Sequence, residues 1–190
     1  NNKGIIDGVV FKDCNVNYSL GNADGWNINT SFVACKNEGT IKNCRVIGSN
    51  SFVFNYNASA NVGCYSESAF KHFKWSTTFR AGSYAAYNYG LIENCTVEGS
   101  LNFSIKSDVY YIYNTLLPYT NAGNGSLTIT AYGVFGGFCA ENNGNIEKCT
   151  SNANIKSTSS SKSVSDQSGI GRNDASAYTS VTYGSVTGIN

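Results

Sequence analysis

The residues best suited to binding chemistry lie in two stretches that mix aromatic and polar side chains. Aromatic faces beside cations can stack on sugar rings or hold anionic groups, and tyrosine offers contact area at low entropic cost. We therefore predict a binding surface in these stretches; the alternative is that the rings fold back over the flank or an open end of the scaffold. The candidates are Phe70, Lys71, His72, Phe73, Lys74, Trp75, Phe79 and Arg80 in the first stretch, and Tyr110, Tyr111 and Tyr113 in the second.

Catalytic chemistry finds little support among the remaining residues. His72 is the only histidine, so a serine or cysteine nucleophile would depend on it, yet no recognisable signature surrounds it. Glu93 and Glu147 share a repeat position and could supply the carboxyl pair of a glycosidase, which lies about 5–9.5 Å apart. The simpler interpretation is two surface glutamates, each near a lysine. No calcium-binding loop or Cys-x-x-Cys pair is present. We expect a protein that is not an enzyme and that uses no metal and no cofactor.

The composition narrows the choice of partners. The chain has 190 residues, 41% of them hydrophobic, and its net charge is only +1. Nucleic acid and anionic membranes attract basic patches, so neither is an expected partner. No apolar run is long enough to span a membrane. We expect one domain over residues 1–190, and the absence of methionine suggests a fragment of a longer chain or a processed subunit of an assembly.

A repeated motif organises the chain. Asn37-Glu-Gly-Thr-Ile-Lys-Asn-Cys44 returns as Asn88-Tyr-Gly-Leu-Ile-Glu-Asn-Cys95 and as Asn142-Asn-Gly-Asn-Ile-Glu-Lys-Cys149. Repetition at intervals of tens of residues is typical of repeat architectures. Aligning on the cysteine adds two weaker copies, one with Phe11 and Cys14 and one with Ala177 and Ser180 at the Ile and Cys positions. The predicted core ladder comprises Cys14, Cys44, Cys95, Cys149, Ile41, Ile92 and Ile146.

Apolar residues alternate with polar ones after each cysteine, which predicts half-buried β-strands. The Ile-x-x-Cys step breaks the alternation, so a corner is expected there, and the preceding Asn-x-Gly predicts a turn because both residues tolerate positive φ. We predict an all-β parallel solenoid (β-helix) of about five to seven coils. The two long intervals between motifs predict aromatic-rich insertions at about 55–83 and 104–129, either protruding loops or degenerate coils, with loops favoured. The Ser-rich segment 157–165 predicts a flexible surface loop.

Equivalent cysteines in one column indicate small buried side chains rather than a disulfide scaffold. Three of the seven cysteines, Cys35, Cys64 and Cys139, fall outside the column. A disulfide among these three remains an alternative.

The motifs resemble the GLUG repeats of bacterial surface and secreted proteins, whose pattern is close to G-G-L-V-G-x-N-x-G-x-I-x-N-C. The nearest match is Gly136-Gly-Phe-Cys-Ala-Glu-Asn-Asn-Gly-Asn-Ile-Glu-Lys-Cys149, and Ser168-Gly-Ile-Gly-Arg-Asn173 preserves part of it. The chain departs from the pattern in its long insertions and in losing most of the first glycines. The resemblance implies a parallel β-solenoid of the kind found in adhesins and as accessory repeats of IgA peptidases, and it carries over no catalytic residue.

Together these features predict a non-catalytic extracellular or cell-surface module with a structural or adhesive role, which displays loops for binding or self-assembly. A carbohydrate-binding or carbohydrate-cleaving β-helix is the alternative. An open solenoid exposes unpaired strand edges, so we expect self-association or pairing with neighbouring coils at its ends. A glycan or a host surface protein is the other expected partner.

Overall fold

The computed structural model describes residues 1–63, 72–114, 125–165 and 173–189, and the statements below refer to these ranges. The described chain is all-β, with eighteen strands and no helix. No helix in these ranges therefore has the length and apolar character needed to cross a bilayer. Neighbouring strands pair in parallel, as the sequence predicted.

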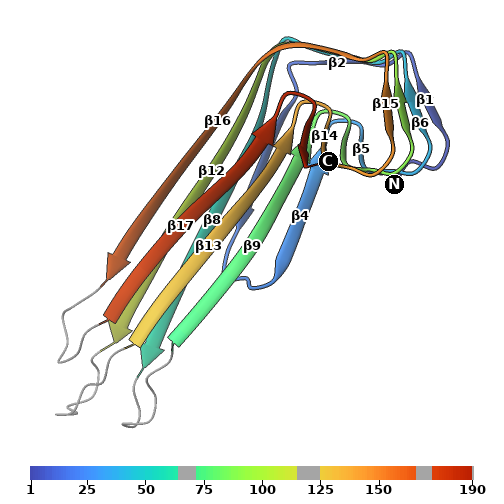
Figure 1. Ribbon diagram of the computed structural model, residues 1–190. Helices are drawn as coiled ribbons and strands as arrows, with labels where there is room; N and C mark the ends of the chain where they lie inside the picture. The colour runs from blue at the N-terminus through green and yellow to red at the C-terminus, as the bar shows by residue number, and fades with distance from the viewer. Residues whose placement is uncertain (64–71, 115–124, 166–172, 190) are drawn as a thin grey trace.

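The strands form four sheets (Figure 1). Sheet B contains β1 (Ile5–Asp7), β6 (Thr40–Lys42), β11 (Leu91–Glu93) and β15 (Asn145–Glu147). Sheet C contains β2 (Val10–Lys12), β3 (Asn15–Leu20), β7 (Arg45–Ile47), β8 (Ser49–Gly63), β12 (Thr96–Asn114) and β16 (Thr150–Ser165). Sheet D contains β4 (Trp26–Ser31), β9 (His72–Gly82), β13 (Gly125–Gly136) and β17 (Asn173–Gly184). Sheet A contains β5 (Ala34–Asn37), β10 (Ala85–Asn88), β14 (Cys139–Asn142) and β18 (Thr187–Ile189).

The described chain runs through sheets B, C, D and A in that order, four times. We call each run a pass. Ile6, Ile41, Ile92 and Ile146 are paired in one row of sheet B, one from each pass. Equivalent asparagines of the second and third passes are 51 residues apart, and those of the third and fourth are 54 apart. The long motif intervals are thus whole passes, which is why four are found rather than five to seven.

The two predicted insertions, 55–83 and 104–129, contain long strands. β8 and β12 have 15 and 19 residues, and β9 and β13 have 11 and 12. These strands extend sheets C and D, which face each other along an arm that projects from the short sheets A and B (Figure 1). The Ser-rich segment 157–165 is not a loop, because β16 pairs with β12 as far as Ser165. Backbone pairing with a neighbouring strand outweighs the weak strand preference of serine.

Two of the five sequence alignments are wrong in the structure. Val10 and Lys12 pair with Arg45 and Ile47. Cys14 therefore lies beyond the position that faces Cys44, and its N–H donates to Asn50 Oδ1 at 2.9 Å. Cys14 is therefore outside the column of Cys44. Ala177 likewise pairs with Ile129 in sheet D rather than with Ile146 in sheet B. Both errors arise because these two copies retain few motif residues, and an alternating pattern alone does not fix the register between strands.

The motif asparagines form a buried ladder. The Asn2 amide donates to Asn37 Oδ1, Asn37 donates to Asn88 Oδ1, and Asn88 donates to Asn142 Oδ1, each at 2.8 Å. Asn37 and Asn88 are completely buried. Each buried amide thus finds its partner on the next pass, which a buried polar group requires. The motif asparagine thus forms this ladder and does not adopt the positive φ that the sequence suggested.

The motif glycine also acts by close approach rather than by positive φ. A Cβ at Gly90 would lie 2.0 Å from the carbonyl oxygen of Gly39, and one at Gly144 would lie 2.2 Å from that of Gly90. The left-handed conformation instead occurs four residues later, at Asn43 (φ 54°) and Asn94 (φ 50°). These residues separate the short strands of sheets B and C, so the predicted corner is confirmed.

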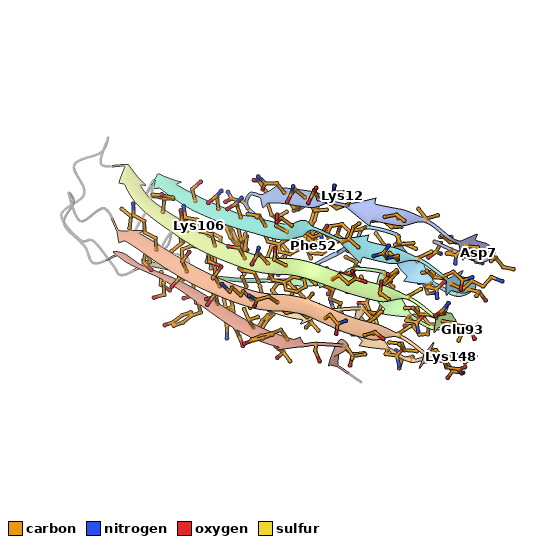
Figure 2. The ribbon with its side chains drawn as sticks, turned by 90° about the horizontal axis from the view of Figure 1, so that it is seen from above. Asp7, Lys12, Phe52, Glu93, Lys106 and Lys148 are labelled. Carbon is orange, nitrogen blue, oxygen red and sulfur yellow. The ribbon has the colours of Figure 1, made fainter. Side chains whose placement is uncertain are left out.

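Stacked phenylalanine rings fill the space between sheets C and D. Phe52 stacks on Phe103 with ring centroids 5.5 Å apart, and Phe103 stacks on Phe135 at 4.6 Å. Phe54 joins Phe135 to Phe79 at 5.7 and 4.8 Å. All five side chains are at most 1% exposed. Figure 2 labels Phe52, which lies on β8. Such ring pairs contribute about 0.5–1.5 kcal/mol each beyond their buried area, so the core holds the two long sheets together.

Candidate functional site

The first predicted binding stretch is divided by the two-residue period of β9. Phe79 is fully buried and Phe73 and Trp75 pack against the core, with their rings 5.5 Å apart. Lys74 is exposed on the opposite face. Phe70 and Lys71 lie outside the described residues, as does the side chain of His72. The described rings and cations therefore do not share one surface.

The second predicted stretch is only partly described. Tyr110 is half-buried on β12, whereas the side chains of Tyr111 and Tyr113 lie outside the described part. Next to Tyr110, Lys106 pairs with Asp108 at 2.7 Å on the same strand. Asp108 is 4% exposed, and this local ion pair compensates part of the cost of its burial.

Arg80 is a predicted residue that joins a polar cluster in the described part of the chain. Its Nε donates to Glu141 Oε1, and its Nη1 donates to Asn27 Oδ1 at 2.9 Å. Its guanidinium also lies over the ring of Tyr87, 5.4 Å from the centroid. The Arg80 and Glu141 side chains are only 18% and 22% exposed. The cluster thus links sheet D to sheet A, and the Arg80 donors named here are directed at protein groups rather than at solvent.

Aromatic and charged side chains continue from this cluster across sheet A. Tyr87 stacks on Tyr89 at 6.3 Å, and Lys36 lies over the Tyr89 ring at 4.9 Å. Lys36 also pairs with Glu38. Burial raises the pKa of the Tyr87 hydroxyl above its usual value. These contacts satisfy the charges locally and create no free acid or base.

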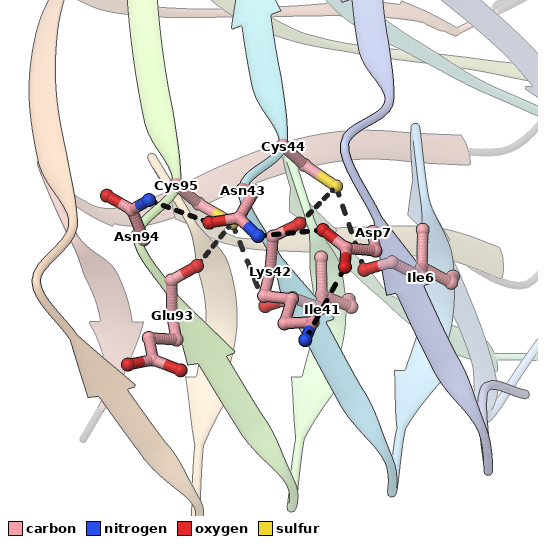
Figure 3. Close-up of polar contacts among 9 residues, drawn as sticks. All are labelled: Ile6, Asp7, Ile41, Lys42, Asn43, Cys44, Glu93, Asn94 and Cys95. Atoms are coloured by element: carbon pink, nitrogen blue, oxygen red, sulfur yellow. Dashed lines mark hydrogen bonds and ion pairs between the residues drawn. The ribbon is translucent and has the colours of Figure 1, made fainter.

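The cysteine column is a set of satisfied thiols. Cys44, Cys95 and Cys149 donate to the carbonyl oxygens of Lys42, Glu93 and Glu147 at 3.1, 3.2 and 3.2 Å, two residues before each thiol. Figure 3 shows two of these contacts beside an outer ladder in which Asn94 donates to Asn43 and Asn43 donates to Asp7. The described cysteines are all free, including Cys35 and Cys139. Cys64 lies outside the described residues.

Cys149 differs from its neighbours in the column. The Cys95 N–H donates to Cys149 Sγ at 3.4 Å, and hydrogen bonding from Cys95 lowers the pKa of the Cys149 thiol to about 7. Hydrogen bonding with Cys149 and burial of the thiol raise the pKa of Cys95. Cys149 is half-buried and its pKa is lowered, so its thiolate forms more readily than that of Cys95. No group of three or more potential metal ligands occurs in the described ranges.

The paired carboxylates are indeed adjacent. Glu93 pairs directly with Glu147 across β11 and β15. Lys148 Nζ, however, lies 2.9 Å from Glu93 Oε1, and this hydrogen bond lowers the Glu93 pKa. A glycosidase acid requires a raised pKa, so Glu93 is not suited to that role.

The outer face of sheet D carries exposed rings that the sequence analysis overlooked. Tyr132 on β13 and Tyr178 on β17 are 45% and 57% exposed. The alternation within β13 could have indicated this, because Leu127, Ile129 and Ala131 occupy the inward positions. Tyr132 was missed because it lies beyond the predicted binding stretches.

Comparison with known proteins gave no relative: no protein family, no curated protein and no solved structure matches the chain. Function must therefore be argued from the geometry.

Proposed function

We propose that this chain is a parallel β-solenoid module with a non-catalytic structural or adhesive role outside the cell. One observation carries the proposal: strands from successive passes are stacked in register in all four sheets. Such stacking makes a stiff body whose outward side chains lie in columns at the strand spacing of about 4.8 Å. We also propose that the chain is related to the GLUG repeat proteins.

The ladders explain why such a body needs few charges. The Asn37–Asn88 amide pair joins two passes through neutral hydrogen bonds. Charged residues of successive passes also form pairs of opposite sign. Lys148 pairs with Glu93, and Arg45 pairs with Glu98 at 3.3 Å. Like charges stacked at this spacing would repel. The composition is thus suited to a stacked scaffold.

The outermost passes favour association with further β-structure. Most of the large apolar side chains that are exposed lie on the first and fourth passes: Ile5, Val9, Val10, Trp26, Val164, Tyr178, Tyr183 and Val186. Unpaired edges with apolar side chains are templates for strand addition. Neighbouring coils, whether of this protein or of a second copy, are the proposed partners.

Cell attachment tests the adhesive role. The chain is displayed on bacteria that lack adhesins, and attachment to epithelial cells and to glycan-coated surfaces is compared with that of the empty display scaffold. Attachment above the scaffold, without release of reducing ends from polysaccharides, is the expected result. Hydrolysis without attachment would refute the proposal.

A second candidate, carbohydrate binding, is favoured by the exposed Tyr132 and Tyr178 side chains. For the cleavage reaction considered with it, the lowered pKa of Glu93 does not suit this residue to the role of general acid.

A further inference from the structure

The outer face of sheet D is a flat surface whose exposed rings belong to neighbouring strands. Tyr178 pairs with Thr130, and Tyr132 pairs with Ser180. The two tyrosines are therefore diagonal neighbours on β13 and β17. With parallel strands about 4.8 Å apart and a rise of about 3.3 Å per residue, their Cα atoms are about 8 Å apart.

Both tyrosines point away from the core. Ile129 and Ala131, on either side of Thr130, are completely buried, and Ala177, next to Tyr178, is 9% exposed. Successive side chains of a strand lie on opposite faces, so Tyr132 and Tyr178 belong to the solvent face. Their exposure is not a defect of core packing.

The side chains around the rings are mainly hydroxylated. Within the described part of this face, the rows of β9, β13 and β17 between those of Lys74 and Arg80 contain no charged residue. Asp24 lies at the border with β4, where its Oδ1 accepts from the Ser76 N–H at 2.9 Å. Arg80 itself is directed at Glu141 and Asn27. The neighbours of the two rings in these rows and at their borders are Ser76, Thr78, Thr128, Thr130, Ser176, Ser180 and Thr182.

The other exposed rings lie in different settings. Tyr89, which is 49% exposed, stacks on Tyr87 and is covered by the Lys36 ammonium. Trp26 pairs with the buried Thr77, and Tyr183 pairs with the buried Phe135, so both occupy core-facing rows at the outermost passes. Tyr132 and Tyr178 alone combine exposure with the solvent face of a long sheet in the described chain.

We propose that this face binds a neutral polysaccharide chain, with Tyr132 and Tyr178 each stacking on the apolar face of one sugar ring. The C–H face of a pyranose packs on an aromatic ring, and serine and threonine hydroxyls can both donate to and accept from sugar hydroxyls. This proposal rests on the proposed function as a module that displays binding surfaces, and it adds that the bound ligand is a neutral polysaccharide.

The charge of the face argues against other ligand classes. A nucleic acid or an acidic glycan would require cations to neutralise it, and Lys74 is the only exposed cation bordering the described face. A neutral glycan also requires little desolvation of charge, because the rings and hydroxyls carry none. A second copy of this chain is the competing occupant, and the test below separates it.

Pull-down on insoluble polysaccharides tests the proposal. The intact chain is incubated with cellulose, xylan, mannan and β-1,3-glucan, and with alginate as the acidic comparison. We expect retention on at least one neutral polymer, little dependence on salt, and no retention on alginate. Tyr132→Ala and Tyr178→Ala each lower the affinity about threefold to tenfold, and the double variant is not retained.

Matched variants keep the test decisive. Tyr89→Ala removes an equally exposed ring elsewhere and leaves binding unchanged, and Tyr132→Phe retains the stacking surface and most of the affinity. Circular dichroism verifies that each variant is folded. Absence of binding to all four neutral polymers, or binding that the double variant retains, overturns the proposal.

Sedimentation and cell attachment separate the remaining explanations. A dimer of the intact chain that Tyr132→Ala and Tyr178→Ala abolish would make a second copy the occupant and overturn the glycan proposal. Cell attachment that survives the double variant would preserve the adhesive role while overturning the glycan face. An intact chain that binds a neutral glycan but does not attach to cells would preserve the glycan face while overturning the adhesive role.

Discussion

Removing one amide from the asparagine ladder is expected to destabilise the whole fold. The completely buried Asn88 amide donates to Asn142 Oδ1 at 2.8 Å and accepts from Asn37 at 2.8 Å. Asn88→Ala removes one donor from the half-buried Asn142 Oδ1 and one acceptor from the fully buried Asn37. The Asn37 amide then retains its 3.3 Å bond to the Leu91 carbonyl oxygen. An unsatisfied buried polar group costs about 1–3 kcal/mol. With two affected neighbours, we expect a loss of about 2–4 kcal/mol in the free energy of unfolding.

Urea denaturation followed by circular dichroism measures this loss. Asn102→Ala is the matched control, because Asn102 is exposed on the outer face of sheet C, and its effect is expected within about 0.5 kcal/mol. Asn88→Asp adds a pH test. Its carboxylate cannot donate to Asn142, and burial raises its pKa, so stability should increase as pH falls and the acid is protonated. If Asn88→Ala were as mild as Asn102→Ala, the ladder would not stabilise the stack.

Further predictions concern close approach, thiol chemistry and the link between sheets. Gly90→Ala places a Cβ 2.0 Å from the Gly39 carbonyl oxygen and is expected to prevent normal stacking of the strands. Thermal unfolding measures this effect, and Gly21→Ala is the tolerated control, because the nearest atom to its Cβ is 4.0 Å away. Equal melting temperatures of the two variants would contradict the prediction. Cys149 should alkylate faster than the buried column thiols, at a rate that rises through about pH 7 as its thiolate forms, which peptide mapping by mass spectrometry checks; equal rates along the column would refute it. A double-mutant cycle of Arg80→Ala and Glu141→Ala is expected to give about 0.5–1 kcal/mol of coupling, and additive effects would show that the pair does not hold sheets D and A together.

The repeated motif determined which residues stack in the central passes. Its Ile and Cys positions, and the corner between them, follow from periodicity alone, because a strand alternates faces and the Ile-x-x-Cys step interrupts that alternation. Ile41 and Ile92 are fully buried and paired in register, as the sequence predicted. Weaker repeats could not be aligned in this way, since an alternating pattern with few motif residues does not fix the register. Cys14 was aligned with Cys44 for that reason, although the strands before it pair in another register.

The tertiary structure alone decided what the long intervals between motifs do. Their alternating residues pair with equivalents 51 and 54 positions away, which no local pattern reveals. It also decided which rings are accessible: Phe79 enters the core, while Tyr132 remains on the surface. The sequence by itself determined the repeat, the strand period and the low charge of the chain. Which face of a strand meets the opposite sheet depends on the register between passes, and that register is a property of the folded stack.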